Sequence, residues 1–223
     1  MIAGVVSCPQ PPLLLPGRTG CPVPEVERLR TACLAAIGEL LAAGPESVVL
    51  IGGIAAAEVD RPAEPVSVRL GRHLLDDAGC SVPIRPVAIR ADAGVEECLA
   101  TGRQLAADAA DAADATAAPG RRIGCLVLAD GSARRGLKAP GYLDPRAAPF
   151  DASIEAALRA GDPAGLAALD AGLAAELLVA GRAAWQVLAG ATEGHRFRAE
   201  TYYLDDPFGV WYPVVAWRPE PAE

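Results

Sequence analysis

The stretch that most constrains the fold is residues 123–143, IGCLVLADGSARRGLKAPGYL, where a short apolar run passes into a polar loop. Residues 123–129 are apolar and lie between Gly120 and Gly131, a pattern typical of a strand that is covered on both faces. Ligands of open α/β sheets bind beyond the carboxyl ends of such strands, so the loop that follows is a candidate site. It carries an acid, a hydroxyl and several cations: Asp130, Ser132, Arg134, Arg135 and Lys138.

The first part of the chain alternates strands and helices. Residues 2–7 and 47–51 are apolar runs, and residues 24–41 between them repeat apolar side chains at helical spacing. A strand, helix, strand order implies that the two strands are parallel. Several prolines stiffen the loop around Gln10 and would fix this residue at the end of the first strand.

The middle of the chain continues the alternation. Ser67 is expected to cap a helix that extends through Leu75. Residues 82–89 are strand-like, and their prolines favour an edge or bulged strand. Residues 94–113 predict a helix that runs into an Ala/Asp-rich tract, which we interpret as a low-complexity helix end and linker.

The C-terminal part predicts one long helix followed by a hairpin. The helix spans about residues 171–189. The hairpin pairs residues 196–204 with residues 210–217 across a DDPFG turn. Pro213 favours an edge position for the last strand.

Together these elements predict a single α/β domain. Its central sheet would be mixed but mostly parallel, flanked by helices and closed by the C-terminal hairpin. A chain of 223 residues is long enough to bury one such core. We expect the domain to span residues 1–218 and residues 219–223 to form a short tail.

Charge and apolar patterning exclude several classes of partner. A net charge of −8 argues against nonspecific binding to nucleic acid, which depends on Lys and Arg at the phosphates. The longest apolar runs fall well below the ~18 residues that cross a bilayer, so we expect no membrane association. The six cysteines include no CxxC motif and no secretion signal precedes them, which favours reduced thiols and a soluble cytoplasmic protein.

Asp130 and Glu176 are the candidate acid/base groups. Asp, Gly and Ser after a strand are also ordinary turn and capping residues, which is the structural alternative for Asp130 and Ser132. Glu176 shares a largely apolar predicted helix with Arg182, and a carboxylate there needs a partner, a hydrogen bond or a proton. The alternative for Glu176 is an exposed position at the rim of that helix.

Basic side chains near these acids are candidate anion-binding groups. Arg134 and Lys138 follow the predicted strand, and Arg182 lies on the C-terminal helix. Arginine can hold a carboxylate or a phosphate with two parallel hydrogen bonds. The alternative, which applies to Arg135 as well, is a solvated loop whose cations pair with the surplus of acids.

Histidine is scarce, and this limits the mechanism. His73 lies in a predicted helix and His195 precedes the hairpin, so neither is at a predicted strand end. A histidine-based metal site or a Ser-His-Asp triad would need a histidine near Asp130 or Gln10. The chain also has no Walker A motif, no GxGxxG after a strand and no HExxH.

Three stretches taken together resemble the LigB-type catalytic B subunits of class III extradiol dioxygenases, a family that includes the Memo proteins, and in particular a bacterial subgroup of it. They are CPQPPLLLPG, ADGSARRGLKAPGYLDPRAAPFD and ELLVAGRAAWQVLAGA, the last before the closing hairpin. The resemblance covers nearly the whole chain. It implies an α/β domain with a metal pocket at the strand ends, where two His and one Glu hold Fe(II) and another His acts as acid/base.

The positions that the resemblance assigns to the metal lack histidine. The first histidine ligand falls on Gln10, and the loop expected to bring the second consists of residues 52–54. Residues 130–135 occupy the segment of the catalytic histidine, Glu176 matches the carboxylate ligand, and Ala180 replaces the cysteine of a Cys-Gly-Arg segment in Memo proteins. A neutral amide is a poor ligand for divalent iron, so we expect no iron cofactor and no ordinary ring cleavage.

The first functional hypothesis is an enzyme, or a former enzyme, that binds and transforms a small anionic or aromatic metabolite without tightly bound iron. Its catalytic residues would be Asp130, Glu176 and Ser132, with Asp130 or Glu176 as the acid/base and Ser132 orienting the substrate. The remaining groups would bind the substrate and hold its charge: Gln10, Arg134, Lys138 and Arg182.

The second hypothesis is a noncatalytic binding or assembly protein, acting as a homodimer or beside a partner subunit. Trp211, Tyr212 and Trp217 on the closing strand would suit a contact surface, and they would equally suit a core. The third is a metal-dependent dioxygenase with an unconventional ligand set, for which stoichiometric iron would be the sign.

Overall fold

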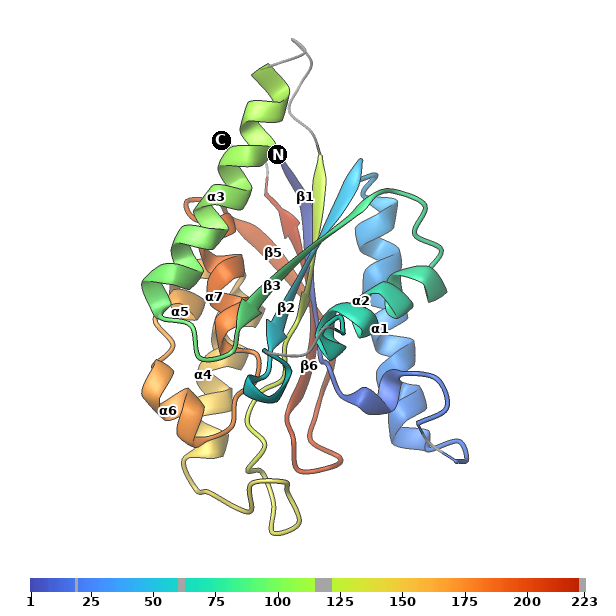
Figure 1. The fold of residues 1–223 in the computed structure, drawn as a ribbon, viewed down its shortest axis with the longest axis vertical. Helices are drawn as coiled ribbons and strands as arrows, with labels where there is room; N and C mark the ends of the chain where they lie inside the picture. Colours follow the sequence, from blue (N-terminus) through green and yellow to red (C-terminus); the bar gives the residue numbers. More distant parts are fainter. Residues whose placement is uncertain (19, 60–62, 115–121, 221–223) are drawn as a thin grey trace.

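The computed structural model describes residues 1–18, 20–59, 63–114 and 122–220, and it contains a mixed sheet flanked by helices on both faces (Figure 1). The sheet has six strands in the order β3-β2-β4-β1-β6-β5. The strands are β1 (Ile2–Cys8), β2 (Ser47–Ile54), β3 (Ile84–Arg90), β4 (Ile123–Leu128), β5 (Phe197–Asp205) and β6 (Tyr212–Pro219). All pairings among β1 to β4 are parallel, and the β5–β6 hairpin joins β1 in antiparallel fashion. The α/β fold and the closing hairpin predicted from the sequence are confirmed.

Helices enclose the sheet in two layers. The helices are α1 (Pro24–Ala42), α2 (Val66–Asp77), α3 (Val95–Asp114), α4 (Ala147–Ala160), α5 (Pro163–Ala167), α6 (Ala171–Glu176) and α7 (Arg182–Ala191), with single 3-10 turns η1 (Pro12–Leu14) and η2 (Ala56–Glu58). α1 and α2 cover one face, and α3 to α7 cover the other (Figure 1). Each face contributes its own cluster of buried apolar side chains, which is why β1 and β4 are apolar on both sides.

The predicted long helix over residues 171–189 is wrong, because the chain breaks between α6 and α7. At the break Leu178 adopts a left-handed backbone with φ of 57°. The N–H of Val179 still donates to the carbonyl of Ala174 in α6, and other backbone groups of the break bond to the loop after β4. The N–H of Ala133 donates to the carbonyl of Leu177 (3.2 Å), and the N–H of Gly181 donates to the carbonyl of Asp130 (2.9 Å).

Two local predictions also need correction. Ser67 does not cap α2, because its hydroxyl donates to the carbonyl of Gly53 at the end of β2 (2.8 Å). β6 is an internal strand instead of an edge strand. Its ladder with β1 covers only Val215 to Trp217, so Pro213 lies outside the part of β6 that has neighbours on both sides.

β3 is an edge strand, as its prolines indicate, and α3 extends to Asp114. The linker prediction for the tract after α3 falls largely on residues 115–121, outside the described residues, as do residues 221–223 of the predicted tail. Among the described helices, none combines the length and the apolar character that a membrane span requires.

The aromatic residues considered as a contact surface belong to the core. Trp211, Tyr212 and Trp217 are all buried. The indole N–H of Trp217 donates to the carbonyl of Leu158 (2.6 Å), and its ring stacks on Phe197 with centroids 5.3 Å apart. Trp217 fastens the hairpin to α4, and none of these three aromatic side chains is exposed to a partner.

The closest helix packing joins α3 and α7 through two glycines. A Cβ at Gly102 would lie 2.1 Å from the carbonyl oxygen of Val187, and one at Gly190 would lie 2.2 Å from that of Leu99. Backbones at this separation leave no room for a side chain. Glycine at these two positions therefore sets how closely α7 lies against α3.

We expect Gly102→Ala to lower the free energy of unfolding by about 1–3 kcal/mol, because the added methyl forces the two helices apart. Gly38→Ala is the matched control, since Gly38 lies mid-helix in α1 with no neighbouring atom within 4 Å of the added Cβ. There the change should raise stability by about 0.5–1 kcal/mol. Urea unfolding measures both, and equal effects of the two substitutions would contradict this account of the packing.

Candidate functional site

The carboxyl ends of β1 and β4 bring Gln10 and Asp130 together. The two strands are adjacent and parallel, and the N–H of Ala129 extends their ladder to the carbonyl of Cys8 (2.8 Å). Just beyond, the backbone N–H of Gln10 donates to Oδ1 of Asp130 (2.7 Å). These are residues that the sequence placed at separate strand ends, and the parallel pairing unites them.

A cleft of about 260 Å³ lies at this edge of the sheet. Its walls come from the ends of the parallel strands, from η2, from the start of α2 and from the segment before α7. The lining residues are Gln10, Pro12, Gly53, Ala55, Glu58, Val66, Ser67, Ala91, Asp130 and Ala180.

Burial of the Asp130 carboxyl raises its pKa from the ordinary 3.8 to about 7, because the ionised form loses hydration that the protein does not replace. The hydrogen bond from the Gln10 N–H opposes this rise and is the smaller effect. Tyr212 faces the same carboxyl, and burial together with Asp130 raises the pKa of its phenol. Asp130 can therefore take up or release a proton near neutral pH.

Gln10 contributes a second unusual group to the cleft. Its side-chain oxygen Oε1 is buried and accepts no hydrogen bond from the part of the chain that the structure describes. A buried acceptor without a donor costs about 1–3 kcal/mol. Its position in the cleft wall makes a ligand N–H or O–H a natural partner.

Ser132, a predicted catalytic residue, belongs to a buried network outside this lining. Its hydroxyl and its backbone N–H donate to the two carboxylate oxygens of Asp151 (2.6 and 2.9 Å). Arg135 lies 3.8 Å from Asp151 and donates to Asp206 at 2.7 Å. Burial raises the pKa of Asp151, and the bonds from Ser132 oppose the rise. The network anchors the loop to α4 and to the β5–β6 turn.

The basic residues predicted to bind an anion lie elsewhere. Arg134 donates to the carbonyl of Gly141 (2.5 Å), within its own loop, and Lys138 is exposed. Arg182 is buried, and its guanidinium donates to the carbonyls of Ala91 (2.8 Å) and Ala93 (2.6 Å) and to Gln186. Arg182 thus ties α7 to the loop after β3, and the lining described above includes no Lys or Arg.

Glu176 occupies the exposed rim of α6, which was the structural alternative for this residue. Its side chain is 60% exposed and pairs with Arg146 at 2.7 Å. Glu176 is the last residue of α6, and the break that follows separates it from Arg182 at the start of α7. Of the three predicted catalytic residues, the structure places only Asp130 in the cleft.

The Fe(II) site implied by the LigB resemblance does not fit the residues present. Among the described residues, no three His, Cys, Asp or Glu side chains group in a way that could hold a metal ion. His73 lies on α2, 3.4 Å from Asp77, and His195 is exposed before β5. Gln10 and Asp130 offer a neutral amide and one carboxyl, a poor donor set for divalent iron.

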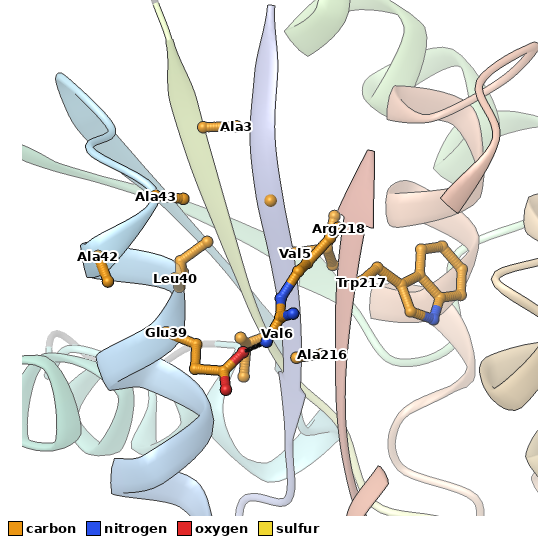
Figure 2. Close-up of a pocket in the computed structure, with 11 residues that line it drawn as sticks. Ala3, Val5, Val6, Glu39, Leu40, Ala42, Ala43, Ala216, Trp217 and Arg218 are labelled. Carbon is orange, nitrogen blue, oxygen red and sulfur yellow. Dashed lines mark hydrogen bonds and ion pairs between the residues drawn. The ribbon is translucent and has the colours of Figure 1, made fainter. Parts of the chain in front are cut away.

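Two larger cavities have walls that are less suited to acid/base catalysis. One of about 420 Å³ lies at the amino end of β1 beside α1, and Figure 2 shows its apolar walls with Glu39 and Arg218 paired at the edge. Another of about 550 Å³ lies where α3 and α5 meet the end of α7. At the first cavity the hydrogen bond from Arg218 lowers the pKa of Glu39, in contrast to Asp130, so size alone does not identify the site.

Comparisons with known proteins bear on the fold alone. No protein-family model matches the sequence, and no curated protein does. Among solved structures, the chain is similar to an uncharacterized protein of Escherichia coli K12, with a TM-score of 0.55 and 14% identity over 96% of this chain and 99% of that chain. At this identity the likeness establishes a shared fold.

We expect Asp130→Asn to stabilise the protein, and to do so more at high pH. The folded carboxyl has the higher pKa, so wild-type stability falls as the pH rises from about 4 to 7 and then stays level. Asparagine keeps an oxygen for the Gln10 N–H and removes the charge. The gain in the free energy of unfolding should be about 2 kcal/mol larger at pH 8 than at pH 5.

Urea unfolding at both pH values measures this difference, with Asp76→Asn on the exposed side of α2 as the matched control. If Asp130→Asn raises the free energy of unfolding equally at pH 5 and pH 8, then burial does not raise the pKa of the Asp130 carboxyl.

Proposed function

We propose that the strand-end cleft binds a small metabolite and that Asp130 acts on it as a general acid or base. The observation that carries this proposal is the Asp130 carboxyl itself, which lines the cleft and has a pKa of about 7. General acids and bases are most effective when their pKa lies near the working pH. Carboxyls with raised pKa values in clefts are typical of active sites.

The geometry assigns different tasks to the two carboxyl oxygens of Asp130. Oδ1 accepts the Gln10 N–H, which fixes the orientation of the group. No donor from the described chain bonds to Oδ2, which leaves this oxygen to exchange a proton with the ligand. Gln10 would then have a double role, orienting Asp130 with its backbone and the ligand with its side chain.

The resemblance to LigB-type dioxygenases supports a site at this edge of the sheet, since that family uses the strand ends. We propose descent from such an ancestor, with the cleft retained and the histidine ligands replaced. All six cysteines are free, which suits the reducing cytoplasm that we propose as its compartment.

The test is a screen of small cationic, neutral, anionic and aromatic metabolites by thermal shift, followed by mass spectrometry of each stabilising compound for conversion. We expect conversion by the full chain and a fall of roughly 100-fold or more in Asp130→Asn, the typical contribution of a general acid or base. Asp76→Asn should convert at the wild-type rate. Undiminished conversion by Asp130→Asn would refute the assignment.

A second candidate function, assembly into a homodimer, is favoured by an exposed apolar patch. Leu137, Tyr142, Leu143 and Leu178 are 80%, 75%, 53% and 45% exposed. They belong to the loop that projects at the bottom of Figure 1 and to the α6–α7 break, and Leu178 lies against Gly141. Tyr142 and Leu178 both have left-handed backbones, a strain that bulky residues rarely carry.

If this patch joins two copies, sedimentation at micromolar concentration should give the mass of a dimer. Tyr142→Asn combined with Leu178→Asn should give the monomer, since both changes introduce asparagine, which tolerates φ > 0, and remove apolar contact area. A wild-type protein that sediments as a monomer of 22.8 kDa would exclude this candidate.

A further inference from the structure

The polar groups of the strand-end cleft define the charge of its ligand. We infer, on the basis of the proposed function, that the ligand presents a protonated amine or amidine to the Asp130 carboxyl and to the side-chain oxygen of Gln10. This differs from the anionic metabolite that the sequence suggested, and it names a substrate class for the same site.

The first reason is that the cleft offers acceptors. Asp130 has Oδ2 free of any described protein donor, and Gln10 Oε1 is buried without one. Glu58 adds a second carboxylate to the lining, held in place by the backbone N–H groups of Ala55 (3.1 Å) and Val66 (2.9 Å). The hydroxyl proton of Ser67 is already donated to Gly53. A ligand with several N–H donors can form hydrogen bonds with these acceptors.

The second reason is that no basic side chain of the described residues lines the cleft. Arg182 gives its donors to carbonyls of residues 91 and 93, Arg134 bonds to Gly141, and Lys138 is exposed. An anion in the cleft would meet the carboxyls of Asp130 and Glu58, and the described lining residues include no cation to balance it. A cation would supply the counter-charge that the buried Asp130 carboxyl lacks.

The third consideration is size. A volume of about 260 Å³ is just below the range of roughly 300–1,000 Å³ for small-molecule pockets. It suits a single ring with a short amine-bearing substituent. The apolar part of such a ligand would contact Pro12, Ala55, Val66 and Ala180 on the walls.

Binding of a cation should depend on pH in a defined direction. Among the described residues, the titratable and polar groups beside Asp130 are Tyr212 on β6, Glu58 in the same cleft lining and the uncharged Gln10, while Arg182 at the start of α7 is turned to the carbonyls of residues 91 and 93. Burial and Asp130 raise the pKa of Tyr212, so that Tyr212 stays neutral. A primary amine, like lysine with a pKa of roughly 10.4, stays protonated. Between pH 6 and 8 the titrating partner is then Asp130.

The experiment uses the full chain and three probes of similar size: benzylamine, benzamidine and benzoate. Titrations followed by ¹⁵N NMR at pH 6 and pH 8 report binding at the amides of lining residues such as Gly53 and Ala91. We expect saturable shifts with benzylamine or benzamidine and none with benzoate. The Kd should be about tenfold lower at pH 8, because the ionised fraction of a carboxyl with a pKa of about 7 rises by that factor.

Substitutions of Asp130 and Gln10 test which side chains bind the amine. Asp130→Asn should weaken amine binding at pH 8 at least tenfold and abolish its pH dependence, while Asp76→Asn should change neither. Gln10→Leu should weaken binding severalfold and keep the pH dependence, because Asp130 retains the backbone N–H of residue 10.

Benzoate binding in the cleft without amine binding would overturn the inferred charge and leave the proposed acid/base role intact. Failure of both amines to bind at up to 50 mM would overturn it as well. Undiminished conversion of a metabolite by Asp130→Asn, in contrast, would refute the proposed function whichever probe binds, so the two failures are distinguishable.

Discussion

The arrangement depends on one constraint, the parallel pairing of β1 with β4. It aligns Cys8 with Leu128 and thereby brings together two loops that are 120 residues apart in the chain. The bond from the Gln10 N–H to Asp130 completes this alignment just past the last ladder pair. Helices cover both faces of the sheet (Figure 1), so a ligand can approach the strands only at their ends, and the loops at the carboxyl edge form the cleft.

The chain uses most of its charged groups near the strand ends to hold loops in place. Asp151 receives two hydrogen bonds from Ser132, and Arg182 donates to carbonyls of the loop after β3. Both are buried, and both leave their donors and acceptors well satisfied. Groups bonded in this way give the loops a fixed shape and are not available to a ligand.

Asp130 and Gln10 differ from these structural groups because their bonding is incomplete. Within the part of the chain that the structure describes, the carboxyl has one bond from a backbone N–H and no cation in the cleft lining, and the buried amide oxygen has no donor. Such groups reduce the stability of the fold, and natural proteins tolerate them mainly at sites that bind or react. This contrast, more than cavity size, distinguishes the strand-end cleft from the larger apolar groove beside α1.

The sequence by itself determined the class of fold. Short apolar runs such as residues 123–129, separated by helical periodicity, specify parallel strands covered on both faces, because this pattern is local and repeats along the chain. It also placed Gln10 and Asp130 at strand ends. Only the tertiary structure decided which charged groups meet. The chain breaks at Leu178 and Glu176 lies exposed, while Ser132 bonds to Asp151 and Arg182 bonds to backbone carbonyls. Each of these contacts involves a partner distant in the chain, and a local sequence pattern does not predict such partners.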